Sequence, residues 1–289
     1  MAGATLLEPR LLSRLERLQL GTRRRLAGAL AGEHRSPNRG ASIDFADYRQ
    51  YHPGDDFRRI DYHLYARLDV LMVKLFEAED DLTLRLFIDT SASMSVGGKL
   101  QQAKRLAAAL GFVALVRRDP VTVHTFPVDR PGPRFVGRSS TWALFDHIDA
   151  LTATGRTTFA TAVTHLLAKP GPPGLTVVIS DLLTNEWEEG LRRLPARGGD
   201  VVVVHVLGRE DMSPSLLGDL DLVDVETGRS VAVSLSPEVV ASYERDALEW
   251  VDRVATRCRH AGAAVVRIMA DDDLERALLG GWRTAGVVR

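Results

Sequence analysis

Apolar and polar positions alternate in two ways from residue 82 onward: short, almost continuous apolar runs are separated by longer amphipathic segments. The apolar runs predict strands over 82–89, 121–127, 175–181 and 200–207. The amphipathic segments predict helices over 99–117, 140–151 and 158–168. Strands joined through helices favour right-handed crossovers, so the sequence predicts an α/β fold with a doubly wound, mainly parallel sheet.

The C-terminal third continues the pattern with a predicted hairpin and a long helix. Apolar runs at 220–225 and 230–235 flank Glu226-Thr227-Gly228-Arg229, a turn with Gly. Ser236-Pro237 then offers a capping hydroxyl and a proline at the first helical position, which predicts a helix over 237–261. A last strand over 263–269 and a last helix over 274–279 complete the predicted α/β domain.

The first eighty residues have a different character. Leucines at positions 11, 12, 15, 18 and 20 share one helical face, so one or two amphipathic helices are predicted within 5–31. Residues 33–80 mix aromatic and charged side chains without a clean period until a predicted strand at 70–76. We therefore expect an N-terminal helical and irregular extension over 1–80 and the α/β domain over 81–289.

Charge and cysteine content narrow the class of protein. The 289 residues hold 37 Lys and Arg against 38 Asp and Glu, so no net field favours nucleic acid or an anionic membrane. Arg23-Arg24-Arg25 is read as the solvated face of a helix. The lone Cys258 excludes an internal disulfide framework and a cysteine-rich zinc module. Charges interrupt the N-terminus and no apolar run could span a membrane, so we expect a cytoplasmic protein without nucleic-acid or membrane partners.

Oxygen-bearing side chains follow the ends of two predicted strands. Asp89, Ser91 and Ser93 end the strand at 82–89, Asp181 ends the strand at 175–181, and Thr157 precedes a helix. The carboxyl ends of parallel strands lie at one edge of a sheet, where open α/β sheets bind ligands, so these five side chains can converge. Two carboxylates and three hydroxyls suit a hard cation, Mg²⁺ or Mn²⁺ before Zn²⁺.

The same residues carry a resemblance to a known site. Asp-Thr-Ser-Ala-Ser at 89–93, Gly-Arg-Thr at 155–157 and Ser-Asp at 180–181 resemble the metal-ion-dependent adhesion site of von Willebrand factor A domains. The resemblance implies that the hydroxyls bind the cation directly and the acids directly or through water. It also implies that one coordination position is left for a carboxylate of a partner protein.

The segment before the α/β domain carries a second resemblance, to the bacterial family called domain of unknown function fifty-eight. The matching positions are Phe45, Tyr48, Arg49, Tyr51, the run 53–56, Arg58, Ile60, Asp61, Ala66, Arg67, Lys74 and Glu79. Asp61-Tyr62 replaces the Asp-Trp usual in that family, and Asp44-Phe45 replaces Glu-Phe. Members are often encoded beside a MoxR-type AAA+ ATPase, which implies such an ATPase or its client as partner, in chaperone-like assembly or maturation.

Within this segment, Asp55, Asp56, Arg58 and Asp61 have two possible roles. Pro53-Gly54 predicts a turn, and the charges beside it can form an ion-pair lattice that docks the segment on the main domain. The same charges are also possible partner contacts. The sequence leaves both roles open.

Three enzyme readings fail on spacing. Gly97-Gly98-Lys99 lacks the remaining Gly and Ser or Thr of a phosphate loop, Gly-x-Ser-x-Gly is absent around Ser91, and Asp89 lacks a second acid two residues on. No catalytic residue is predicted. We expect a non-enzymatic, metal-dependent interaction module. The alternatives are a metal-dependent hydrolase using the same cation and a structural scaffold whose site is unused.

Overall fold

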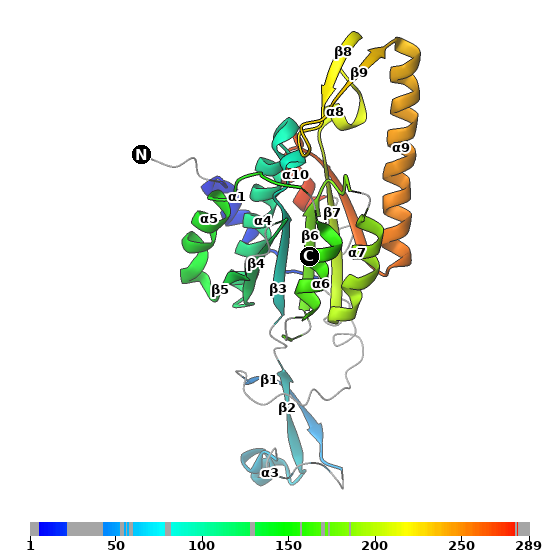
Figure 1. Cartoon of the computed structure of the whole chain (residues 1–289). Coiled ribbons are helices and arrows are strands. Elements are labelled where there is room, and N and C mark those ends of the chain that lie inside the picture. The colour runs from blue at the N-terminus through cyan, green and yellow to red at the C-terminus, as the bar shows by residue number, and fades with distance from the viewer. Residues whose placement is uncertain are drawn as a thin grey trace. The chain divides into compact units, whose positions relative to one another are not determined.

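A computed structural model describes residues 6–21, 43–52, 55, 57, 60–78, 82–127, 131–156, 158–168, 171–172, 174–184, 186–280 and 282 (Figure 1). The chain divides into two compact units, one of Met1–Leu30 with Leu82–Arg289 and one of Ala31–Asp81. Each unit is described by itself. The predicted division into 1–80 and 81–289 stays a prediction, while these units group residues 1–30 with the larger body.

A six-stranded sheet in the order β10-β7-β6-β3-β4-β5 forms the centre of the larger unit. All neighbours are parallel except β4 and β5, which are antiparallel, so the predicted α/β fold with a mainly parallel sheet is confirmed. The bounds are β3 (Thr83–Asp89), β4 (Val121–Phe126), β5 (Pro131–Phe135), β6 (Gly174–Ser180), β7 (Gly199–Leu207) and β10 (Ala264–Met269).

The sequence did not predict β5. Its two prolines, Pro131 and Pro133, cannot donate to a ladder, which argues against a strand in the middle of a sheet. At the edge of a sheet, one side of a strand needs no partner, so prolines are tolerated there. The position of β5 at the sheet edge explains why its sequence contains prolines and why the apolar pattern did not predict it as a strand.

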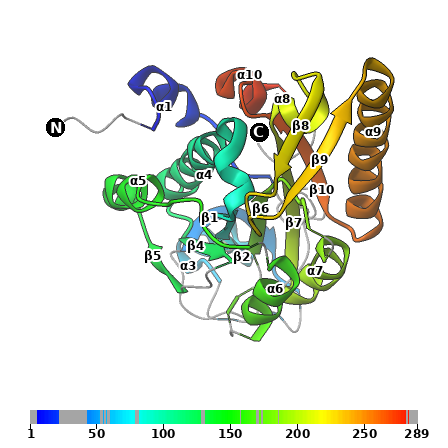
Figure 2. The ribbon, with the colours of Figure 1, turned by 45° about the horizontal axis from the view of Figure 1, so that its top comes forward.

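Helices cover both faces of the sheet (Figure 2). The first core cluster joins the sheet to α1 (Pro9–Leu15), α4 (Lys99–Val116), α5 (Thr141–Asp149) and α10 (Leu274–Leu279). The second joins it to α6 (Phe159–Ala168), α7 (Trp187–Arg193) and α9 (Pro237–His260). Short helical segments complete the unit: η2 (Ala92–Gly98), η3 (Arg138–Ser140), η4 (Leu194–Arg197) and α8 (Arg209–Met212).

Strand β3 is buried on both of its faces, as its almost continuous apolar run indicates. Every residue of β3 is buried. Leu86 and Ile88 point into the first core cluster, and the intervening Phe87 points into the second, because successive side chains of a strand face opposite sides. The ring of Phe87 lies 4.8 Å from that of Phe126 and 6.1 Å from that of Phe159.

The N-terminal leucines belong to the core of the larger unit. Leu7, Leu11, Leu15 and Leu20 are buried in the first cluster. Helix α1 falls within the predicted helical stretch 5–31. Residues 22–31, including Arg23, Arg24 and Arg25, lie outside the described residues.

The predicted hairpin is present as β8 (Gly218–Val223) and β9 (Ser230–Leu235), which form a two-stranded antiparallel sheet. Gly228 in its turn has φ +70°, a conformation that glycine adopts without a Cβ clash. Figure 1 shows the hairpin beside α8 and the beginning of α9, at one end of the central sheet.

The smaller unit pairs β1 (Ile43–Gln50) with β2 (Met72–Ala78) in an antiparallel ladder. Helix α3 (Tyr62–Leu68) begins after Asp61, whose carboxylate accepts hydrogen bonds from the amides of His63 (2.9 Å) and Leu64 (3.2 Å). The strand predicted at 70–76 corresponds to β2, whereas β1 and α3 had no clean sequence period.

In the part of the chain that the structure describes, no helix combines the length and apolar character needed to cross a membrane.

Gly199 offers a test of strand packing. Its φ is +94°, and a Cβ there would overlap the backbone of Gly174 on the paired strand β6. Gly199→Ala therefore incurs both backbone strain and a steric clash. We expect it to lower the free energy of unfolding by about 1–3 kcal/mol more than Gly218→Ala.

Gly218→Ala is the matched control because Gly218 has φ +101° and nothing within 4 Å of the added Cβ. Urea titration of both variants measures the difference. Equal losses of stability would show that the backbone contact between β6 and β7 has no such effect.

Candidate functional site

The predicted site lies where two neighbouring central strands end. Strand β3 ends at Asp89 and its parallel partner β6 ends at Ser180, directly before Asp181. Asp89, Ser91 and Asp181 are each 0 % exposed, and Ser93 is partly exposed. Figure 2, in which the top of Figure 1 comes forward, shows this edge of the sheet. The structure thus brings together four of the five predicted ligand positions at one edge.

Asp89 is held by hydrogen bonds on both carboxylate oxygens. Its Oδ1 accepts from the amide of Ser91 (2.9 Å), and its Oδ2 accepts from the hydroxyl of Ser180 (2.6 Å). The hydroxyl of Ser180 in turn accepts from the amide of Leu182 (2.9 Å). Strand β6 therefore positions the carboxylate of Asp89 on β3 through Ser180, which is not among the predicted ligands.

The two predicted serine ligands lie next to each other. The Oγ atoms of Ser91 and Ser93 are 3.0 Å apart. Backbone hydrogen bonds tie this loop to residues 154–155: the amide of Ala92 donates to the carbonyl of Gly155 (2.9 Å), and the amide of Thr154 donates to the carbonyl of Thr90 (2.7 Å). The fifth predicted ligand, Thr157, lies outside the described residues.

Asp181 is engaged by an amide and by a buried ammonium group. Its Oδ1 accepts from the amide of Leu183 (3.1 Å), and its Oδ2 lies 2.8 Å from Nζ of Lys99. The same Nζ lies 3.0 Å from Oδ2 of Asp211, whose Oδ2 also accepts from the amide of Gly208 (2.7 Å). Lys99 therefore bridges the end of β6 and the short helix α8.

Burial determines the protonation behaviour of the site. Desolvation, followed by repulsion from Asp181, raises the pKa of Asp89 to about 7. Burial by itself would lower the pKa of Lys99, but the carboxylates of Asp181 and Asp211 outweigh it and raise that pKa. Burial also lowers the pKa of His205 to about 4, and Nε2 of this neutral ring donates to the carbonyl of Asp181 (3.0 Å).

The donor set fits a hard divalent cation. Two buried carboxylates and a pair of hydroxyls are the oxygen groups that Mg²⁺ and Mn²⁺ take as ligands. A cation near Asp89 would offset the desolvation and repulsion that raise its pKa. Among the described residues, no three His, Cys, Asp or Glu side chains form a cluster able to hold a metal ion.

The sequence analysis did not predict a role at this site for three of its residues: Lys99, Ser180 and Asp211. Lys99 did carry a signal, because a lysine at the first position of a long helix lies at the positive end of the helix dipole and needs carboxylates nearby. Ser180 stands directly before Asp181 and could have been included. Asp211 had no signal, since only the fold places α8 beside β6.

The possible partner contacts of the smaller unit have local structural roles. The carboxylate of Asp55 accepts from Nη2 of Arg49 (2.9 Å) and from the amide of His52 (2.9 Å). Asp61 caps α3 and accepts from the hydroxyl of Tyr48 (2.8 Å). Asp56 and Arg58 lie outside the described residues. Partner contact through these four residues stays a prediction.

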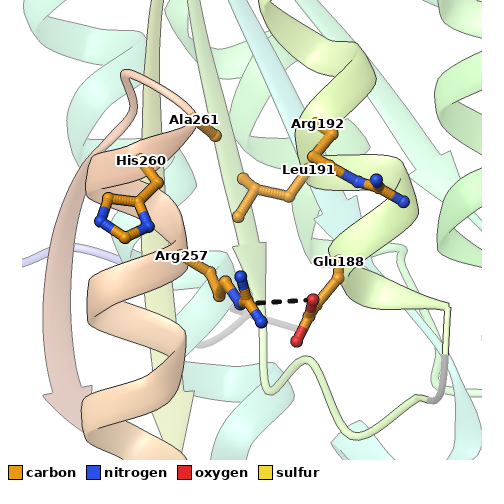
Figure 3. A pocket seen from close by; sticks show the side chains of 6 residues that line it. All are labelled: Glu188, Leu191, Arg192, Arg257, His260 and Ala261. Carbon is orange, nitrogen blue, oxygen red and sulfur yellow. Dashed lines mark ion pairs between the residues drawn. The ribbon is translucent and has the colours of Figure 1, made fainter.

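Two surface pockets lie on the α7–α9 side of the larger unit. One, of about 370 Å³, lies between α7 and the last turn of α9, where Glu188 and Arg257 form an ion pair of 3.4 Å (Figure 3). The second, of about 460 Å³, is lined by Arg156, Leu183 and Trp250 among others, and so borders the loops that follow Asp181 and precede Thr157. Neither pocket is lined by Asp89 or Asp181.

Comparison with solved structures finds similar chains, among them two from Bacteroides. The conserved hypothetical protein BatB of Bacteroides thetaiotaomicron aligns with TM-score 0.39 and 15% identity, over 71% of this chain and 98% of that one. An aerotolerance-related membrane protein of Bacteroides fragilis aligns with TM-score 0.40 and 16% identity, over the same shares.

Sequence comparison finds relatives in mycobacteria. Uncharacterised proteins of Mycobacterium tuberculosis strain H37Rv and Mycobacterium bovis are each 28% identical over 283 residues, which is 92% of this chain and 87% of theirs. An uncharacterised protein of Mycobacterium avium is 29% identical over 115 residues, 39% of this chain and 68% of that protein. The family described as "Protein of unknown function DUF58" matches residues 47–252. The chain therefore belongs to the DUF58 family.

Proposed function

We propose that the protein is a non-enzymatic interaction module that binds a partner protein through a divalent cation, Mg²⁺ or Mn²⁺. The cation would be held by Asp89, Ser91, Ser93, Thr157 and Asp181, as in a metal-ion-dependent adhesion site of a von Willebrand factor A domain. The observation that carries this proposal is the burial of Asp89 and Asp181 at the ends of adjacent strands, with a pair of hydroxyls beside them.

The electrostatics of the two carboxylates support a bound cation. Burying an ionised carboxylate is costly unless a positive charge or several hydrogen bonds compensate it. Lys99 contacts Asp181, whereas the carboxylate of Asp89 is contacted by an amide and a hydroxyl, which are neutral donors. A divalent cation beside Asp89 supplies the missing positive charge, and the paired oxygens of Ser91 and Ser93 supply neutral ligands.

The position of the site supports the likeness to a von Willebrand factor A domain. Asp-x-Ser-x-Ser begins at the last residue of the central strand β3, and Ser-Asp begins at the last residue of its parallel neighbour β6, in a largely parallel sheet. Ligand sites of such sheets lie at the carboxyl ends of the strands. Of the hydroxyl pair at this edge, Ser91 is buried and Ser93 is partly exposed. A group from a partner would therefore approach the proposed cation from the side of Ser93.

The state of the ionisable groups supports a binding role over catalysis. A hydrolase using the cation needs a base free to take a proton from water. His205 is 1 % exposed, and its Nε2–H is used on the carbonyl of Asp181. Asp181 is paired with Lys99, and Asp89 accepts two hydrogen bonds. Both carboxylates are thus committed to holding the site together.

A MoxR-type AAA+ ATPase, or its client, is the partner that we propose. This part of the proposal comes from the family resemblance in the segment around 45–79. In this role the module would present the partner to the ATPase, or dock on the ATPase itself, during chaperone-like assembly or maturation. The cation would then make docking depend on one acidic side chain of the partner.

Cation binding is the first test. We expect Mg²⁺ to bind the wild-type protein in isothermal titration calorimetry and Asp89→Asn to weaken binding by about 100-fold or more, since even groups behind the ligands contribute about 10–100-fold. Asp146→Asn, which changes an exposed carboxylate of α5, is the matched control and should bind like the wild type. Equal affinity of wild type and Asp89→Asn would contradict the proposed site.

The pH dependence of stability gives a second test. In chelator, Asp89 titrates near pH 7 in the folded protein, against 3.8 for an ordinary aspartate, so between these values the folded state binds more protons than the unfolded state. The free energy of unfolding should therefore fall as pH rises through this window, by up to about 1.4 kcal/mol per pH unit relative to Asp89→Asn.

Mg²⁺ should flatten this pH dependence, because a bound cation stabilises the ionised carboxylate. Guanidinium titrations at several pH values, with chelator and with Mg²⁺, measure the effect. His205 titrates in both proteins, so its contribution cancels in the comparison. A wild-type curve parallel to that of Asp89→Asn in chelator would show that Asp89 is not held in a desolvated, repulsive environment.

The partner is tested with the purified MoxR-type ATPase of the same genome as bait. We expect it to retain the wild-type protein in Mg²⁺ and to release it in chelator, because the cation bridges the two proteins. Asp89→Ala should be retained in neither condition. Retention of both proteins under both conditions would place binding on another surface, with Asp55 and Asp61 as the next residues to replace.

A further inference from the structure

Lys99 links the proposed cation site to the segment that carries the exposed hairpin. It is 1 % exposed, and its Nζ lies 2.8 Å from Asp181 and 3.0 Å from Asp211. Asp211 lies in α8, whose chain continues into β8. The hydroxyl of Tyr243 on α9 donates to the carbonyl of Asp211 (3.1 Å). A single buried ammonium group therefore bridges β6 and the α8–α9 region.

Without the carboxylates of Asp181 and Asp211, the position of Lys99 in the fold would be electrostatically unfavourable for a positive charge. It is the first residue of the 18-residue helix α4, directly after Gly98, which has φ +79°. The N-terminus of a helix carries partial positive charge, so a lysine there is destabilising unless acidic groups offset it. Both acidic partners come from other elements, which indicates that the ammonium serves the site and is not a helix cap.

The net charge of the four ionisable side chains Asp89, Lys99, Asp181 and Asp211 can be compared with the charge of one divalent cation. Asp89, Asp181 and Asp211 carry three negative charges when ionised, and Lys99 carries one positive charge, which leaves a net charge of two negative units. That charge equals and opposes one divalent cation. With Lys99 removed, the same cation would be surrounded by three negative charges, and the loaded site would repel an acidic group from a partner.

We infer that Lys99 is the internal counter-ion of this site, and that it limits the site's negative charge so that a bound divalent cation still attracts a partner's carboxylate. The inference rests on the proposed function and names the residue that regulates it. Lys99 is not a ligand here. It acts through Asp181 and Asp211, lowering cation affinity while it preserves the electrophilic character of the bound cation.

The test compares two charge changes of opposite sign, with Mg²⁺ as the probe in calorimetry. Lys99→Met keeps the length of the side chain and removes the positive charge, so Mg²⁺ should bind about tenfold more tightly or better. Asp211→Asn removes a negative charge and keeps an acceptor for the amide of Gly208, so Mg²⁺ should bind more weakly, by several-fold. Lys99→Arg retains the charge and should stay close to the wild type.

A purely structural role predicts a different pattern, because Lys99→Met and Asp211→Asn would then both weaken Mg²⁺ binding by disturbing Asp181. That result, or unchanged affinity in Lys99→Met, overturns the inference while leaving the proposed cation site intact. No Mg²⁺ binding by any variant, the wild type included, overturns the proposed function and the inference with it. If Lys99→Met does not fold in chelator, Lys99→Gln takes its place as the charge-removing variant, and weaker or unchanged Mg²⁺ binding by Lys99→Gln overturns the inference.

Discussion

The parallel pairing of β3 with β6 is the constraint on which the site depends. It ends two adjacent buried strands at the same level, and therefore places Asp89 and Asp181 together in a region from which water is excluded. In such a region a charge that is weak in water becomes energetically important, because solvent no longer screens it. The hydrogen bond of Ser180 and the ion pair of Lys99 offset part of the cost of burying these carboxylates, and the proposed cation would offset more of it.

The core is organised so that this edge can be held rigidly. Side chains of β3 alternate between two separate core clusters, one under α4 and α5 and one under α6, α7 and α9. Helix α4 is buried along most of its length, so its first residue, Lys99, has little freedom to move away from Asp181. Packing thus restricts the ammonium and the carboxylates, which would lower the cost of ordering the site on binding the proposed cation.

The central sheet and the β8–β9 and α9 region of the larger unit differ in how far they are buried. The central sheet is apolar on both faces and supplies stability, while the hairpin β8–β9 and much of α9 are exposed to solvent. Large apolar side chains such as Leu222, Val231 and Leu248 are about half exposed or more in this region. The ion pairs of Lys99 join the buried part to the start of the exposed part through Asp211. A change of charge at the sheet edge can therefore alter the ion pair of Asp211, in the segment that leads into the hairpin.

Periodicity in the sequence was sufficient for most of the larger unit. The strands β3, β4, β6, β7 and β10 and the helices α4, α5, α6 and α9 lie within a few residues of their predicted bounds, because each is long enough to show an unambiguous apolar pattern. The edge strand β5 and the smaller unit were less predictable. The two prolines of β5 obscure its strand pattern, and the segment that forms β1 and α3 mixes aromatic and charged residues without a clean period.

The sequence by itself determined the α/β class, the oxygen-bearing side chains of Asp89, Ser91, Ser93 and Asp181, and the edge of the sheet at which they gather, since local pattern and parallel topology suffice for these. Only the tertiary structure decided which charges neutralise which. Lys99 and Asp211 are 112 positions apart, and Lys99 and Asp181 are 82 apart. No local pattern links residues at such separations. Their contact results from packing helix α4 and helix α8 against the ends of β6 and β7, and so exists only in the folded chain.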